Sequence, residues 1–322
     1  MAAMLILPAV IIAVRAVIVF PECHLIVREM WNKARIRQLT VFAGWQAFGG
    51  LGAIARSQGI AILINRHAEF GPARNSSMTI ANQIAAQTET LASAMVGAFQ
   101  PAIANAYGAK DYERMKSLAF RACKFGTLLS AIFVLPLALE LPTVLKIWLK
   151  EPPEYAAGLC WSILAMHLID RTATGHMLAV AATGKIALYQ AFLGGSLILT
   201  LPVAWLFVHL NWGIYATGWA MILTMMLCAW GRVWFARTIA GMSAWYWVKK
   251  IFFPLVILFS IVLIVGILPQ IFLPASIVRV IITTLVCEFV LLPLTWKFAF
   301  NGPEKRIVCD KLKGLRMRLT GG

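Results

Sequence analysis

Residues 250–272 read KIFFPLVILFSIVLIVGILPQIF, and this stretch decides the class of protein. It holds one charged residue, Lys250, and a helix of this length can cross a hydrocarbon core of about 30 Å. The rest of the chain is similar, because 61% of its 322 residues are hydrophobic and only 13% are charged. A soluble domain holds roughly 45–50% apolar and about 25% charged residues. The sequence therefore predicts an all-α, polytopic membrane helix bundle and excludes a soluble globular domain.

Outward from this stretch, apolar runs of membrane-spanning length recur along the whole chain. The nine predicted spans are 2–20, 39–64, 76–103, 118–142, 157–183, 186–208, 212–236, 250–272 and 276–298. Of the 29 lysines and arginines, 21 fall in segments that follow every second span. Those segments are 21–38, 104–124, 184–185, 232–250 and 297–322. Lys and Arg collect in cytoplasmic loops of membrane proteins, so the C-terminus is predicted to be cytoplasmic and the N-terminus outside.

The formal net charge of +16 is explained by this topology, because no aromatic-basic module that would bind nucleic acid accompanies it. The six cysteines form no C-x-x-C pair and no zinc-binding spacing. The H-E-x-x-H, G-x-S-x-G and dinucleotide-binding motifs are also missing from the sequence. We therefore expect no enzyme activity, no cofactor, no metal site and no nucleic-acid partner, and we expect membrane lipids to surround the chain.

The predicted span 76–103 is polar along one side. At 100° per residue its polar residues fall in an arc of about 160°, opposite an apolar side. Among them are Asn82, Gln83, Gln87, Glu89, Thr90 and Ser93. Ser77 and Thr88 are the two exceptions. A polar stripe facing lipid is costly, so this face is expected to line a hydrated cavity. The alternatives are a polar helix–helix interface or a helix lying on the membrane surface.

Two further spans carry charged residues. Arg56 in span 39–64 shares an arc with Gln46, and the small residues Gly49 and Gly50 lie beside it. In span 157–183, His167, Asp170 and Arg171 follow the i, i+3, i+4 spacing of one helix face. Ionisable groups inside a membrane are candidates for function. The alternative is that Glu89 and Asp170 pair with Arg56 and Arg171 only to order the bundle.

Several blocks of sequence, in the same order, resemble a known family of transporters. They are FPECH (20–24), FAGWQAFGGLGAIARSQGIAILIN (42–65), FGPARNSSMTIANQI (70–84), FQPAIANAYGAKDYERM (99–115), VLKIWLKEPPEY (144–155) and ATGKIALYQAFLGG (182–195). They are similar to polysaccharide and lipopolysaccharide biosynthesis flippases of the multidrug/oligosaccharidyl-lipid/polysaccharide (MOP) exporter superfamily. The resemblance covers roughly residues 20–250.

The resemblance implies a fold of two pseudo-symmetric six-helix lobes, often with two extra C-terminal helices. On that map residues 1–38 are the last helix of a truncated first lobe and a basic linker. Residues 39–237 are the second lobe, and residues 238–322 are the two additional helices with a basic tail. Five helices of the first lobe would then be missing, which agrees with a first span that begins almost at Met1.

The implied function is to flip an oligosaccharide on polyprenyl pyrophosphate from the cytoplasmic to the outer leaflet of a bacterial inner membrane, with glycan-assembly enzymes as partners. A hydrated cavity suits sugars, and a cationic side chain suits pyrophosphate. We expect Arg56 to contact the pyrophosphate, with Arg171 as a second candidate. The full set of candidate substrate-binding residues is Arg56, Arg171, Asn82, Gln83, Gln87, Glu89, Thr90, Ser93, His167 and Asp170.

Two other functions remain open from the sequence. In a multidrug or cation antiporter of the same superfamily, Glu89 or Asp170 would carry the coupling ion, but the arginines beside them would repel a cationic substrate. A non-transporting, truncated membrane fragment is the other alternative.

Overall fold

The computed structural model describes residues 11–12, 14–15, 18–19, 32–66, 71–300, 302 and 305. These residues form helices and connecting turns without any strand, so the prediction of an all-α membrane helix bundle is confirmed for them. The chain divides into two units, residues 1–45 and residues 46–322. The predicted first span, 2–20, lies mostly outside the described residues, and the three-part domain division stays a prediction.

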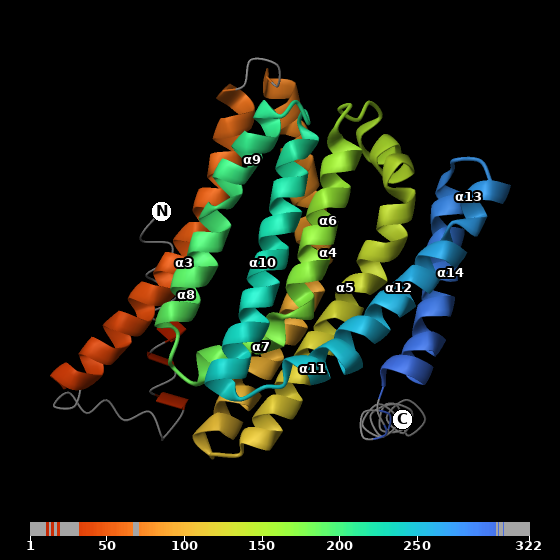
Figure 1. The fold of residues 1–322 in the computed structure, drawn as a ribbon. Helices are drawn as coiled ribbons and strands as arrows, with labels where there is room; N and C mark the ends of the chain where they lie inside the picture. Colours follow the sequence, from red (N-terminus) through yellow and green to blue (C-terminus); the bar gives the residue numbers. More distant parts are fainter. Residues whose placement is uncertain are drawn as a thin grey trace. The chain divides into compact units, whose positions relative to one another are not determined.

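Three long helices open the described chain. They are α3 (Lys33–Arg66), α4 (Gly71–Gly108) and α5 (Tyr112–Leu149) (Figure 1). Asp111 caps the start of α5, because its carboxylate accepts a hydrogen bond from the backbone N–H of Arg114 over 3.1 Å. Within the second unit α4 packs against both α5 and α6. α4 and α5 extend five to seven residues beyond their predicted spans at both ends, and α3 extends six residues beyond its span at the start and two at the end.

The next two predicted spans are each broken in the middle. The first consists of α6 (Ala156–Thr172) and α7 (Thr174–Ala182), and the second of α8 (Ala187–Ile198) and α9 (Thr200–His209). The break after α6 accompanies a close approach to α5, since a Cβ on Gly175 would lie 1.9 Å from the carbonyl oxygen of Ala119. Trp247 also donates from its indole N–H to the Thr172 carbonyl over 2.9 Å. The Trp247 hydrogen bond gives the Thr172 carbonyl a partner where the helix is interrupted, and the packing at Gly175 holds α7 against α5.

The C-terminal part contains one long helix and two further helical segments. The long helix is α10 (Tyr215–Ala240). The first segment joins α11 (Ala244–Trp247), η1 (Val248–Phe252), α12 (Phe253–Gly266) and α13 (Leu268–Phe272). The second joins α14 (Ile277–Leu294) and η2 (Thr295–Ala299). Gly241 ends α10 with φ +64°, a left-handed conformation that glycine adopts without strain.

Six helical stretches are long and apolar enough to cross a membrane. They are Lys33–Arg66, Tyr112–Leu149, Ala187–His209, Tyr215–Ala240, Ala244–Phe272 and Ile277–Phe298. The predicted spans 76–103 and 157–183 are helical but are not among these six stretches. The first is α4, which has a polar side, and the second is divided into the shorter helices α6 and α7. The described residues therefore contain helices at all eight predicted spans from 39–64 onward.

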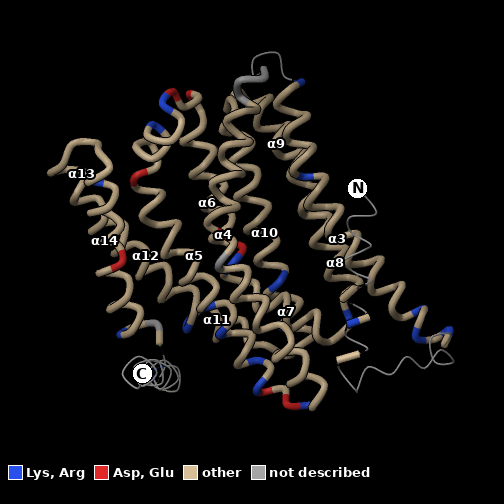
Figure 2. The backbone as a smooth tube through the Cα atoms, turned by 180° about the vertical axis from the view of Figure 1, so that it is seen from behind, with Lys and Arg blue, Asp and Glu red and all other residues tan. Residues whose placement is uncertain are grey.

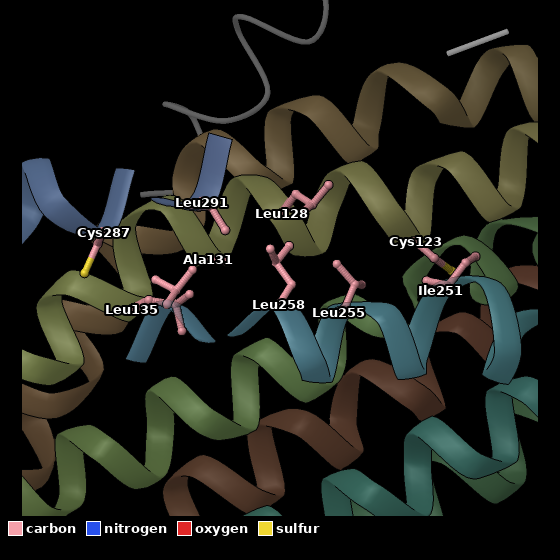
Figure 3. Packing of buried hydrophobic residues seen from close by; sticks show 10 residues of the cluster. Cys123, Leu128, Ala131, Leu135, Ile251, Leu255, Leu258, Cys287 and Leu291 are labelled. Atoms are coloured by element: carbon pink, nitrogen blue, oxygen red, sulfur yellow. The ribbon is translucent and has the colours of Figure 1, made fainter. Parts of the chain in front are cut away.

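The last two spans pack against α5 through a continuous apolar cluster. Figure 3 shows Leu255 and Leu258 of α12 pointing toward the helix that carries Leu128, while Leu291 comes from α14. All four leucines are buried. Complete burial of a leucine side chain is worth about 1.5–3 kcal/mol. This cluster attaches the C-terminal helices to the remainder of the second unit.

An ion pair reinforces the same attachment, and neither of its residues is among the candidates predicted from the sequence. Arg279 of α14 donates from Nη2 to the Glu140 carboxylate of α5 over 2.9 Å. The same nitrogen donates to the Thr143 hydroxyl over 2.7 Å, and the Thr283 hydroxyl donates to Glu140 over 2.8 Å. Glu140 is only 1% exposed, so its charge depends on these donors.

Candidate functional site: charged residues within the helix bundle

The first element of the site is an ion pair between α4 and α6. The Arg171 guanidinium pairs with the Glu89 carboxylate and also donates to the Ser93 hydroxyl over 2.8 Å. Ser130 of α5 donates to the second oxygen of Glu89 over 3.2 Å. Glu89 is 7% exposed, whereas Ser93 is exposed. One of the pairings that the sequence left open is therefore present, and it links three helices.

The second element is an ion pair between α6 and α10. Arg232 donates from Nη2 to the Asp170 carboxylate over 2.8 Å and from Nη1 to the Asp170 backbone carbonyl over 3.1 Å. Arg232 is 7% exposed. Sequence reasoning missed this residue, because it was counted in the basic, cytoplasmic segment 232–250. The missed signal is the apolar and aromatic run Val233–Phe235 beyond it, which continues α10 to Ala240.

The third element is Arg56 of α3, which pairs with neither candidate acid. Its Nη1 is buried without a hydrogen-bond partner among the described residues, and Asp170 and Arg232 lie within its electrostatic range. The alternative in which Arg56 pairs with Glu89 or Asp170 is therefore not found among the described residues. The physical reason is competition, since Arg171 and Arg232 occupy the two carboxylates at hydrogen-bond distance.

The position of Arg56 follows from close packing between α3 and α8. A Cβ on Gly52 would lie 2.8 Å from the Cα of Gly194, so the two backbones touch where both residues lack a side chain. One helical turn and a half earlier, Gln190 of α8 donates from Nε2 to Gln46 of α3 over 2.6 Å. The polar arc predicted for this span thus faces α8 at Gln46, and its other member, Arg56, lies within electrostatic range of the Arg232–Asp170 pair.

His167 completes the charged group but makes no ion pair there. It is half-buried on α6, within electrostatic range of Glu89, Asp170 and Arg56. The predicted helix face of His167, Asp170 and Arg171 lies on α6. Thr174, the first residue of α7, donates its hydroxyl to the Asp170 carbonyl over 3.0 Å. Figure 2 shows acidic and basic positions close together near α4, α6 and α10, away from the helix ends.

The polar side of α4 lies on an exposed surface of the described structure. Its exposed members are Asn82, Gln83, Gln87, Thr90 and Ser93. Ala81, Ala85 and Ala92 are buried on the other side, together with Thr88, whose hydroxyl donates to the Ala85 carbonyl over 2.8 Å. The exceptions to the polar arc, Ser77 and Thr88, are both buried. Glu89 and Ser93 belong to the same polar side of α4, and both contact Arg171. They therefore connect this side to the ion pairs.

The site contains three guanidinium groups and two carboxylates among the described residues, which leaves one positive charge in excess. No group of three or more His, Cys, Asp or Glu side chains in this part of the chain is placed to hold a metal ion. Such a site is suited to an anion, because guanidinium binds phosphate or carboxylate oxygens by parallel hydrogen bonds.

Comparison with known proteins gives one family match. The family model described as MatE matches residues 60–206, from the end of α3 to α9. Searches of curated proteins and of solved structures found no match. MatE proteins are membrane transporters and not enzymes. This chain is a multi-pass membrane protein, and its residues 60–206 are similar to the MatE transporters of the MOP superfamily.

Proposed function

We propose that the chain acts in flipping a polyprenyl-pyrophosphate-linked oligosaccharide across the bacterial inner membrane, and that Arg56 binds the pyrophosphate. One observation carries this proposal. The Nη1 of Arg56 is buried without a hydrogen-bond partner among the described residues, beside an Arg232–Asp170 pair that is already complete. An unpaired cation within a membrane is costly, and an anionic ligand would offset that cost.

The two other arginines have different roles in this proposal. Arg232 is held at both Nη1 and Nη2 by Asp170, and Arg171 is held by Glu89 and Ser93. They hold the acids away from Arg56 and keep the local charge positive. Arg171 remains the second candidate for contact with the ligand, since it borders on the exposed Ser93.

The exposed amides and hydroxyls of α4 supply the sugar-binding part of the proposal. Asn82, Gln83, Gln87 and Thr90 offer both donors and acceptors, which sugar hydroxyls require. A cation antiporter is a poorer fit, because Glu89 and Asp170 are each paired with an arginine. The inner-membrane location, the cytoplasmic C-terminus and the glycan-assembly partners belong to the same proposal.

Ligand competition tests the substrate class. The full chain, purified in lipid nanodiscs, is titrated with polyprenyl pyrophosphate, with the polyprenyl alcohol of equal length and with the organic cation tetraphenylphosphonium. We expect the pyrophosphate to bind at least about tenfold more tightly than the alcohol, and the cation not to compete. Equal binding of alcohol and pyrophosphate contradicts the proposal. Cation binding that Glu89→Gln or Asp170→Asn abolishes supports the antiporter, and failure to bind any of the three supports a non-transporting chain.

A further inference from the structure

The last membrane-spanning stretch has one side that no other described residue covers. Within the second unit α14 packs against α5, α12 and α13 (Figure 1). Its buried residues are Thr283, Cys287 and Leu291, and the last two belong to the apolar cluster with α5 and α12 (Figure 3). Of the six stretches that can cross a membrane, Ile277–Phe298 has the smallest buried share, 17%. The opposite side of α14 is therefore free for lipid or for another protein.

The residues of this free side are regularly spaced. We call them the α14 seam, and they are Val278, Ile281, Leu285, Glu288 and Leu292. The intervals between them alternate between three and four residues, and at 100° per residue they fall within an arc of about 80°. Such spacing places side chains along the line of contact between two helices that cross at a shallow angle. The four apolar members are all more than half exposed.

Glu288 distinguishes this side from an ordinary lipid-facing surface. Eleven residues of Ile277–Phe298 precede it and ten follow, so it lies near the middle of the hydrocarbon core that the stretch can cross. Its Oε1 is enclosed by the protein and has no hydrogen-bond partner among the described residues. Thr284, one turn earlier, donates its hydroxyl to the Val280 carbonyl over 2.8 Å. By contrast, Glu140 of α5 accepts hydrogen bonds from Arg279 and Thr283.

A second copy of the chain can supply what lipid cannot. A charged carboxylate at the centre of a bilayer is costly, and lipid tails offer no hydrogen-bond donor. Two neutral carboxyl groups are complementary, because the O–H of each donates to the carbonyl oxygen of the other. Copies inserted in the same direction are related by a two-fold axis along the membrane normal, which brings each residue of α14 beside the same depth of the second α14. Glu288 then meets its own counterpart.

From this geometry we infer that the chain forms a two-fold dimer through the α14 seam, with the Glu288 carboxyl groups of the two copies hydrogen-bonded to each other at the membrane centre. Ile281 and Leu285 pack against their counterparts on one side of this contact, and Leu292 packs on the other. Hydrogen bonds between polar side chains are one of the forces that associate membrane helices. The seam includes neither Arg56 nor any residue of α4, so the dimer does not depend on the proposed substrate.

Energy transfer between full-length chains in lipid vesicles tests this inference. Chains labelled with a donor or with an acceptor fluorophore are reconstituted together and diluted stepwise with lipid. We expect wild type to dimerise, and Glu288→Leu to lower the association constant about tenfold. Glu288→Gln should keep most of the association, because an amide also offers both a donor and an acceptor. The matched control is Glu154→Leu, which removes an exposed acid between α5 and α6 and should associate like wild type.

Disulfide crosslinking locates the contact independently. In a variant without native cysteines, Leu285→Cys should form a disulfide between two chains when a membrane-permeable oxidant is added, because Leu285 is on the seam. Ile257→Cys is the control and should stay monomeric. Ile257 is 46% exposed in the preceding span, α12, but is not part of the seam.

Three results would overturn the inference. They are a wild type that stays monomeric over the whole dilution series, unchanged association of Glu288→Leu, and equal crosslinking through Leu285→Cys and Ile257→Cys. A monomeric wild type would assign the seam to lipid or to a different membrane protein. Elution profile and thermal unfolding check that each variant is folded. If Glu288→Leu does not fold, the crosslinking comparison still decides, because it leaves Glu288 in place.

Discussion

At the scale of single residues, the site separates arginines that stabilise the bundle from one that is available to a ligand. Arg232 is buried and Asp170 is half-buried, and loss of one partner leaves the other charge without compensation. We predict that Arg232→Gln lowers stability by about 3–5 kcal/mol. The amount of protein in the membrane and its thermal unfolding temperature should both fall.

The double variant Arg232→Gln/Asp170→Asn provides the control for this prediction. It removes both charges together, so it should recover most of the lost abundance and stability. A double variant as unstable as Arg232→Gln alone would show that Arg232 contributes through something other than this ion pair.

Which residues belong to the candidate site was predictable from the sequence where their placement depends on helix periodicity alone. The α4 face and the spacing of His167, Asp170 and Arg171 could be derived from 100° per residue. The partners could not, because the choice among arginines depends on how the helices are rotated and shifted against each other. Glu140 and Arg279 were missed although both lie inside predicted spans, where any ionisable residue needs a partner.

At the scale of elements, the break between α6 and α7 was not predictable, because the residue at the break is Ala173 and not a proline or a glycine. The interruption arises from tertiary contacts, where α7 meets the backbone of α5 at Gly175. We predict that Gly175→Ala destabilises the protein by about 1–3 kcal/mol, because the added Cβ would overlap the Ala119 carbonyl and force the helices apart. Thermal unfolding of the purified protein measures this loss.

Gly195→Ala is the matched control, because a Cβ at this α8 position meets no atom within 4 Å. Its unfolding temperature should stay the same or rise slightly, since alanine favours the helix. If the two variants unfold at the same temperature, then the close approach at Gly175 does not determine the packing of α7 on α5.

At the scale of the whole molecule, composition predicted the helix class, and the apolar runs located eight spans whose ends differ from the helix ends by up to seven residues. We predict further that Lys150 and Lys185 lie on opposite sides of the membrane, because α6 and α7 together connect them. In a variant without native cysteines, Lys150→Cys should react with an impermeant thiol reagent added to intact spheroplasts. Lys185→Cys should react only in inverted vesicles. Labelling of both from one side would contradict the predicted topology.

The central claim, that Arg56 binds the pyrophosphate of a lipid-linked sugar, is tested most directly by binding of polyprenyl pyrophosphate to Arg56→Lys. Lysine keeps the charge but cannot form the two parallel hydrogen bonds of guanidinium. We expect at least about tenfold weaker binding with normal protein abundance, whereas Arg66→Lys, at the exposed end of the same helix, should bind like wild type. Unchanged binding in Arg56→Lys and in Arg56→Gln would contradict the claim.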